Sequence, residues 1–462
     1  MISPAPFRAE LRALVRLALP LSIAASGQAL MGVVATAVVG RAGAVAMAGA
    51  GLGNSIFFAV SVLGMGLMHG VDPLVSQALG AGDPTRARRF LWQGIWLAGA
   101  TSLVLAVPLA LAPLALVHLG IPPEVAAQAG RYMHLRLPGL PLFLLYFVAR
   151  AYLQSHGIAR PMVVAVLLAN ALNLPAVAIL VFGGGALPAW TGPLRLVPPM
   201  GAGGAALATT LCMLVQSAVL VAAISRVPFP RGAGGHRRFA RAEVWAAFRV
   251  GAPIALHMGT EVGFFALVAF LAGRLGAGAM AAHQLALSLA SLTFTFAVGF
   301  GEAGSVRVGW AVGARDRGAA RRAGLAAFAG GVGFMSVSAL TFLLFPAALA
   351  RLMTDDARVI ATAVPLLRVA ALFQLSDGLQ GVGAGVLRGA GETRFTFLAN
   401  VVGHWLVGLP ATLLLGLALG HGVTGLWGGF CFGLTTVGVA LLARFLRVSS
   451  REIVPLADRA AA

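Results

Sequence analysis

Lysine is absent from this chain, because all 33 basic residues are arginine. A Walker A phosphate loop, a retinal Schiff base and a pyridoxal phosphate site each depend on a lysine. The absence therefore excludes an ATP-driven motor of the Walker type, a light-driven pump of the retinal type and a pyridoxal enzyme. Any transport by this chain must draw its energy from an ion gradient or from a partner.

Charge is also scarce. Only 10% of the residues are charged and 59% are hydrophobic, with a mean hydropathy of +0.91, so too few polar residues exist to coat a water-soluble globule. The formal net charge is +19, but the arginines occur in short clusters between long apolar stretches. They form no continuous face that could follow a phosphate backbone, so we expect a lipid bilayer as the surroundings and no nucleic acid as a partner.

Cysteine is rare as well. Cys212 and Cys431 both lie inside apolar segments, where a thiol usually packs as a small hydrophobic group. We expect neither a disulfide nor a metal site from them.

The apolar stretches have the length of membrane-spanning helices. Transmembrane strands would be about ten residues long with strict alternation, and helices are the other way to satisfy the backbone in lipid. We therefore predict an all-α integral membrane protein with twelve transmembrane helices, at 14–39, 49–78, 91–117, 131–155, 161–183, 201–225, 246–272, 280–312, 323–348, 361–388, 395–419 and 424–446.

The sequence repeats itself at an offset of 233 residues. Pro20 matches Pro253, Gly66 matches Gly299, and Asp83 matches Asp316. One long period with a single copy in each half is typical of a transporter built by duplication, and six spans per half make the two lobes parallel repeats. The predicted organisation is a six-helix lobe at 1–225, a linker at 226–245 rich in proline and glycine, and a second six-helix lobe with a short tail at 246–462.

The arginines indicate the orientation. Of the 33, 25 fall at the termini, in the linker and in the turns on one side, against eight on the other. Positive charge is retained on the cytoplasmic side, so both termini and the linker are expected to be cytoplasmic.

Four of the fourteen acidic residues lie within predicted spans, where charge is costly and usually functional. Glu261 is about 18 Å from the outer end of its helix, and Asp377 is about 16 Å from the inner end of another, at 1.5 Å per residue. Both are thus near the midplane and in the second lobe, where they can line one cavity and bind a proton or sodium. The alternative is a pair of protonated carboxyls that bond to neighbouring helices.

Other polar residues extend or mirror this cavity. His257 shares a helix face with Glu261, and Gln374 and Gln380 share one with Asp377. A histidine within a membrane span is often only a hydrogen-bonding group in helix packing, and this alternative applies to His257 and to His404. The repeat aligns Gln28 with Glu261 and places Asp377 near Phe143. The first lobe therefore lacks charge at the matching positions, and we expect the ion site in the second lobe alone.

Asp72 and Glu302 fall in the inner thirds of their spans. One possibility is that they act in gating. The alternative is a structural role, in which Arg307 screens their charge or their side chains extend to the membrane–water interface.

The chain resembles the multidrug and toxic compound extrusion (MATE) transporters over essentially its whole length. Three segments are the most specific part of this resemblance. These are Gln374-Leu-Ser-Asp377-Gly-Leu-Gln380 through Thr393, Gly259-Thr-Glu261, and Leu74-Val-Ser-Gln77 through Ala81. The resemblance to the NorM-like branch implies a bacterial inner-membrane antiporter, not an enzyme, that exports small cationic lipophilic compounds in exchange for protons or sodium. It implies no other cofactor and no obligate protein partner.

The sequence departs from this family in its first helix. Ala35, in Gly32-Val-Val-Ala35-Thr36, stands where many bacterial members have an aspartate. A first-lobe ion site is therefore not expected. Asp72, in Gly70-Val-Asp72-Pro-Leu74, is more similar to an Asp-Thr-Leu run of eukaryotic members.

Two alternatives remain open. A lipid-linked sugar flippase of the same wider superfamily would line its cavity with arginines, and the predicted spans have almost none away from their ends. A membrane-embedded transferase would need clustered acids or a His-Asp set, for which Asp355-Asp356 is too little.

Overall fold

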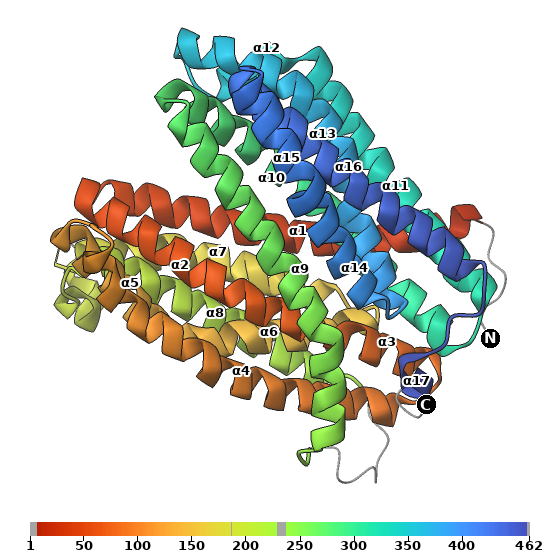
Figure 1. Cartoon of the computed structure of the whole chain (residues 1–462). Coiled ribbons are helices and arrows are strands. Elements are labelled where there is room, and N and C mark those ends of the chain that lie inside the picture. The colour runs from red at the N-terminus through yellow and green to blue at the C-terminus, as the bar shows by residue number, and fades with distance from the viewer. Residues whose placement is uncertain (1–6, 186, 229–236, 460–462) are drawn as a thin grey trace. The chain divides into compact units, whose positions relative to one another are not determined.

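The computed structural model describes residues 7–185, 187–228 and 237–459, and helices are the only regular elements in these ranges (Figure 1). Eleven continuous helical segments are long and apolar enough to cross a membrane. A further pair of helices, bent by 50°, meets the same test when its two parts are taken together. Twelve spans result if this pair counts as one, so the predicted all-α membrane fold is confirmed.

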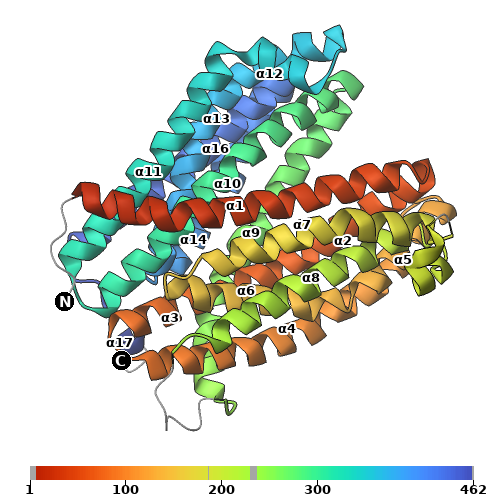
Figure 2. The same cartoon turned by 180° about the vertical axis from the view of Figure 1, so that it is seen from behind.

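The main helices correspond to the predicted spans in order, and Figure 2 shows them from behind. Their bounds are α1 Phe7–Gly40, α2 Ala44–Met68, α3 Val71–Gly80, α4 Pro84–His118, α5 Pro123–Arg136, α6 Gly139–Ser155, α7 Arg160–Phe182, α8 Ala202–Ser225, α9 Arg241–Arg274, α10 Ala277–Gly313, α11 Arg317–Leu344, α13 Ala357–Gly389 and α16 Gly422–Ser449. Short helices η1 Ala189–Leu196, α12 Pro346–Met353 and α17 Leu456–Arg459 occupy connections and the C-terminal tail.

The fourth span differs from its prediction. It consists of α5 and α6, which are separated at Leu137 and Pro138, and it begins at Pro123 rather than at residue 131. Pro138 lacks a backbone N–H, and its ring crowds the preceding turn of the helix, which accounts for the break. Arg136 consequently lies at the bend inside the span, about 20 Å along the helix from Pro123 at 1.5 Å per residue.

The eleventh span is irregular. It runs from α14 Thr393–Asn400 through the π-helix η2 Val401–Gly408 and the short α15 Leu409–Leu413 to a second π-helical turn, η3 Leu414–Ala418. π-Helical segments concentrate at functional sites. Asn400 and His404 lie at the start of this irregular stretch.

The chain forms two compact units. The N-terminal unit contains residues 23–71 and 88–248, and the C-terminal unit contains 1–22, 72–87 and 249–462 within the described ranges. This grouping differs from lobes at 1–225 and 246–462, because the start of α1 and all of α3 except Val71 belong with the C-terminal helices. Of the predicted linker at 226–245, residues 229–236, with Pro230 and its glycines, lie outside the described residues.

Close backbone packing explains why α3 groups with the C-terminal helices. A Cβ atom on Gly80 would lie 2.1 Å from the Trp310 carbonyl oxygen of α10, and one on Gly313 would lie 2.0 Å from the carbonyl oxygen of Gln77. The Gln77 side chain also donates to the Gly389 carbonyl oxygen of α13 at 2.9 Å. Small residues thus allow α3 to dock on α10, as is common between helices in lipid.

The core of the C-terminal unit joins α9, α10, α13 and α16 through buried rings of Phe264, Phe373, Trp427 and Phe430. Toward the C-terminal ends of α10 and α13, the two helices approach so closely that a Cβ on Gly385 would lie 2.2 Å from the Gly301 carbonyl oxygen. The glycines of α13 therefore serve helix packing in this unit.

This packing yields a stability prediction. Gly385→Ala places a methyl group against the backbone of α10, so the helices must separate, and overpacking of this kind costs about 1–3 kcal/mol. We expect a lower thermal unfolding temperature for the purified protein in detergent. Gly333→Ala is the matched control, because nothing lies within 4 Å of its added Cβ on α11. Equal unfolding temperatures for both variants would contradict the packing argument.

Candidate ion site and its charged surroundings

Glu261, on α9, is the centre of a buried polar group in the C-terminal unit. Its Oε1 accepts a hydrogen bond from Gln380 Nε2 of α13 at 3.2 Å. Its Oε2 lies 3.4 Å from Nε2 of His257, which is one helical turn earlier on α9. The i, i+4 spacing places both side chains on one face of the helix, so the imidazole orients the carboxylate toward α13.

Asp377 provides a second carboxylate on α13. Its side chain is 3% exposed, and it has no hydrogen bond or ion pair within the described part of the chain. It precedes Gln380 by three residues, which places both on the face of α13 toward Glu261, and the two carboxylates interact electrostatically. Two acids thus share a low-dielectric site, and neither forms an ion pair with an arginine in the part of the chain that the structure describes, an arrangement that favours a bound cation.

Several buried polar atoms around the acids lack a protein partner. Gln380 Oε1 and His257 Nδ1 are unpaired, and so are Asn400 Nδ2 and His404 Nε2 at the start of the irregular span. Buried polar atoms without partners are uncommon and call for a ligand or water. Carboxylate and amide oxygens are the ligands that hard cations such as sodium prefer, and the carboxylates can equally bind protons. This set of side chains therefore fits either a proton or a sodium ion.

A further layer of hydrogen bonds holds this group in place. Thr260 Oγ1 donates to Asn400 Oδ1 at 3.0 Å, and the Trp405 indole donates to the Thr260 carbonyl oxygen at 3.3 Å. The Gln374 amide contacts the Thr293 hydroxyl of α10 at 2.8 Å. Gln374 is thus engaged with α10 and supports α13 rather than bonding to either carboxylate.

The structure brings together four of the residues singled out in the sequence, namely Glu261, Asp377, Gln380 and His257. Gln28 lies in the N-terminal unit, where its Oε1 accepts a hydrogen bond from Gln216 at 3.1 Å. Asn400 was missed in the sequence. A polar residue at a π-helical irregularity is a usable signal, but the irregularity itself is not visible in the amino-acid pattern.

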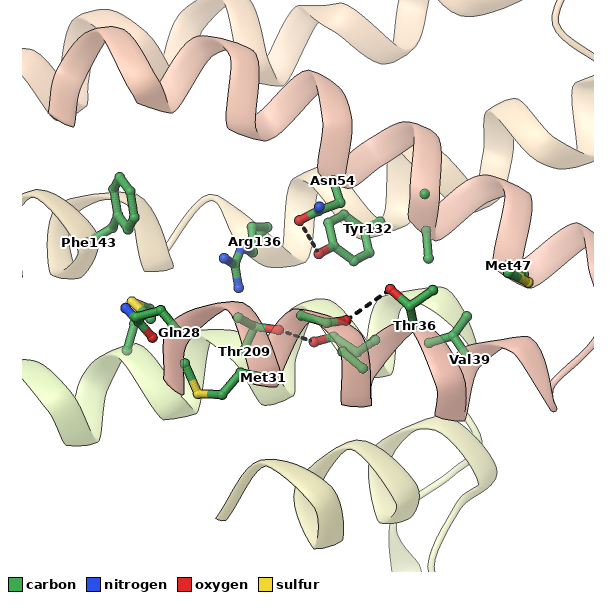
Figure 3. Close-up of a pocket in the computed structure, with 16 residues that line it drawn as sticks. Gln28, Met31, Thr36, Val39, Met47, Asn54, Tyr132, Arg136, Phe143 and Thr209 are labelled. Atoms are coloured by element: carbon green, nitrogen blue, oxygen red, sulfur yellow. Dashed lines mark hydrogen bonds between the residues drawn. The ribbon is translucent and has the colours of Figure 1, made fainter. Parts of the chain in front are cut away.

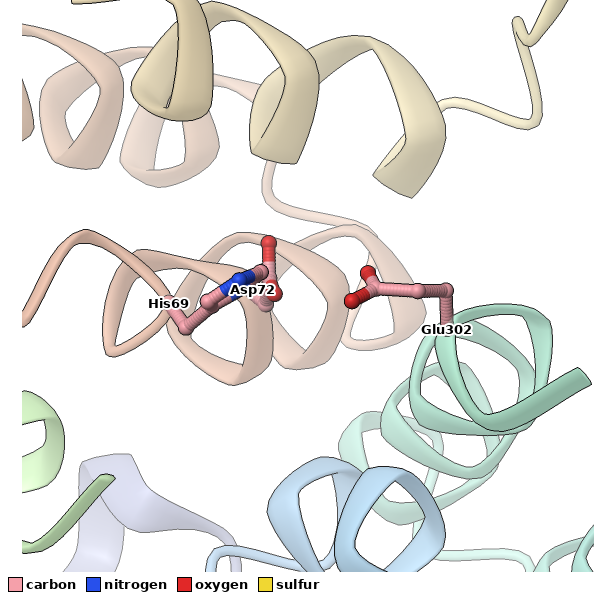
Figure 4. A group of neighbouring side chains, drawn as sticks. All are labelled: His69, Asp72 and Glu302. Carbon is pink, nitrogen blue, oxygen red and sulfur yellow. The ribbon is translucent and has the colours of Figure 1, made fainter. Parts of the chain in front are cut away.

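Asp72 and Glu302 form a separate charged cluster in the C-terminal unit, where their carboxylates face each other (Figure 4). Arg388 joins them, with Nε 3.5 Å from Asp72 Oδ2 and Nη2 3.1 Å from Glu302 Oε1. The expectation that Arg307 screens these acids is wrong, because Arg307 forms a bidentate pair with Glu10 at 2.5 and 2.7 Å. Arg388 is the partner because it ends α13 beside α3 and α10.

The cluster predicts a large stability effect. Arg388→Gln leaves Asp72 and Glu302 buried without a cation, and removal of one partner of a buried ion pair typically costs about 3–5 kcal/mol. We expect a clear fall in thermal unfolding temperature and in membrane abundance. Arg394→Gln is the control, since Arg394 is exposed and has no ion pair among the residues described. Unfolding of Arg388→Gln at the control's temperature would show that the cluster adds no stability.

The architecture and the buried acids define a multi-pass helical membrane protein with a polar site inside its second half. The MatE family model matches residues 20–179 and 253–414, and the two matches begin 233 residues apart (253 against 20), as the repeat does. The chain belongs to the MATE family.

Relatives and solved structures agree with this assignment. The chain is 33% identical to the probable multidrug resistance protein NorM of Rhizobium meliloti, over 97% of this chain and 95% of the relative. It is 32% identical to the multidrug resistance protein MdtK of Edwardsiella ictaluri, over 94% and 95%. A crystal structure of a MATE protein in the straight conformation has the same fold, with a TM-score of 0.84, 21% identity and 96% of both chains covered.

Proposed function

We propose that this protein is a secondary active antiporter that exports cationic lipophilic compounds, including drugs or toxins, in exchange for inward protons or sodium. The observation that carries the proposal is the pair of buried carboxylates, Glu261 and Asp377, neither of which forms an ion pair with an arginine among the described residues. The names of the NorM and MdtK relatives, which are multidrug resistance proteins, support the export of organic compounds. The relatives are bacterial, and a bacterial inner membrane with cytoplasmic termini is part of the proposal.

Coupling follows from competition for negative charge. With both carboxylates ionised, the site attracts an organic cation, because uncompensated charge in a low dielectric is costly. Entry of a proton or sodium neutralises the site and weakens the hold on the organic cation, which leaves outward. The membrane potential contributes about 2.3 kcal/mol per charge per 100 mV when net positive charge moves inward.

Each neighbouring side chain has a role in this proposal. Gln380 fixes one oxygen of Glu261, and its own unpaired oxygen is available to a sodium ion. His257 holds the other oxygen of Glu261 and keeps the carboxylate on the α13 side of its helix. Asp377 has no competing protein contact within the described residues and is the group most open to exchange between ions.

Alternating access is the second part of the proposal. A duplicated helical protein can open its site to either side of the membrane by movement of one repeat against the other. We propose that occupancy of the acid pair biases this movement, and that the buried Asp72–Arg388–Glu302 cluster is a gating contact that changes with it.

The distribution of arginine does not separate the flippase alternative from the antiporter. The expectation that the spans have almost no arginine away from their ends is wrong for the fourth span, which begins at Pro123 and contains Arg136. The match to the MATE family, rather than the arginine distribution, is the stronger argument for the antiporter.

The test is transport by the purified protein in liposomes loaded with a fluorescent organic cation, under imposed proton or sodium gradients. Glu261→Gln and Asp377→Asn each remove one carboxylate charge that the proposed exchange needs. We therefore expect the rate of gradient-driven transport to fall at least about tenfold, which corresponds to the loss of about 1.4 kcal/mol of interaction energy. The gradient that drives the unaltered protein identifies the ion.

Asp355→Asn is the matched control, because Asp355 is an exposed acid in the connection before α13. It should transport at the unaltered rate. Full gradient-driven transport by both Glu261→Gln and Asp377→Asn would overturn the proposal.

A further inference from the structure

We propose that a pocket within the N-terminal unit binds the carboxylate of an amphipathic organic molecule, with Arg136 as the group that recognises it. The pocket has a volume of about 250 Å³ and is enclosed by α1, α2, α5, α6 and α8 (Figure 3). The proposal does not rest on the antiport function, because it concerns binding at a different set of residues.

Arg136 is a buried cation that forms no ion pair with any residue the structure describes. It is 9% exposed, and its Nε and Nη1 have no hydrogen-bond partner. None of the sixteen residues that line the pocket is acidic. Figure 3 shows the guanidinium projecting from α5 into the space opposite Gln28 and Met31. An arginine inside a membrane span normally has a carboxylate or phosphate partner, so this one indicates a ligand that supplies it.

Arg136 does contact an aromatic ring, but this interaction is weak. Its Cζ lies 5.0 Å from the centre of the Phe57 ring, a cation–π contact. Such a contact stabilises one face of the guanidinium but leaves its N–H groups unsatisfied. Those N–H groups form a planar fork that matches the two oxygens of a carboxylate.

Neighbouring amides add donors rather than acceptors. The Tyr132 hydroxyl donates to Asn54 Oδ1 at 3.1 Å, and Gln216 Nε2 donates to Gln28 Oε1 at 3.1 Å. Each of these amide oxygens thus already accepts one hydrogen bond from the protein, and the amide N–H groups of Asn54 and Gln28 are available as donors. The pocket therefore offers hydrogen-bond donors around a positive charge, which suits an oxyanion and disfavours an organic cation.

The other residues that line the pocket indicate what kind of molecule bears the carboxylate. Most are apolar, and the larger ones are Met31, Val39, Met47, Phe143 and Met213. Methionine side chains adapt to irregular apolar ligands. An aryl or alkyl body with one carboxylate fits both parts of the pocket, and a zwitterionic compound would do so through its acidic end.

The experiment is a fluorescence titration of the purified full-length protein in an uncharged detergent, with dansylglycine and with its uncharged amide. We expect the unaltered protein to prefer the acid by roughly tenfold or more, as a charge-assisted hydrogen bond implies. Arg136→Gln should reduce this preference to about one. Arg131→Gln, which changes an exposed arginine on the same helix, should retain it.

Two further variants separate recognition from folding. Arg136→Lys keeps the charge and should retain part of the preference. Gly32→Leu, at a pocket-lining position with nothing within 4 Å of its Cβ, should fill the pocket and abolish binding without touching the charge. Thermal unfolding shows whether each variant is folded.

Three results would overturn the inference. One is an unchanged preference for the acid in Arg136→Gln, and another is unchanged binding in Gly32→Leu. The third is displacement of bound dansylglycine by short-chain phosphatidylglycerol at a concentration below that at which dansylglycine itself binds. This result would show that the pocket is a lipid site. Glu261→Gln should not change the binding of dansylglycine, which is measured without an ion gradient. A failure of the antiport proposal can therefore be told apart from a failure of this inference.

Discussion

Burial of charge away from water is the constraint on which this structure depends. Backbone groups are satisfied within helices, but an ionised side chain inside a helical membrane protein requires a partner or a cavity. Arg388 closes one cluster by binding Asp72 and Glu302. Glu261 and Asp377 form no ion pair with an arginine among the described residues, which is why we propose that their site takes up cations from outside the protein.

Duplication has produced two halves of similar architecture and different chemistry. The repeat aligns Glu261 with Gln28 and places Asp377 near Phe143, and both of these first-half residues line the pocket of the N-terminal unit. The first half is thus not merely uncharged at the matching region, as the alignment alone implies. Arg136 gives this region the opposite sign, because its positive side chain lines the same pocket as Gln28 and Phe143.

The sequence was sufficient for the helical fold and for the acid pair, because span length and the rarity of membrane carboxylates are properties of composition. It was insufficient where geometry decides. The bend at Pro138 moved the start of the fourth span and so concealed that Arg136 is interior. Arg307 is nearer to Glu302 in sequence than Arg388 is, yet only the packing of α13 beside α10 reveals the true partner.

Direct measurement of ion release at the acid pair tests the central claim. The claim is that one organic cation and the coupling ion compete for Glu261 and Asp377. Addition of a cationic ligand to the purified protein should release protons into a weakly buffered solution, or bound radioactive sodium. The release should be absent from Asp377→Asn. Equal release from the unaltered protein and from Asp377→Asn would contradict the account.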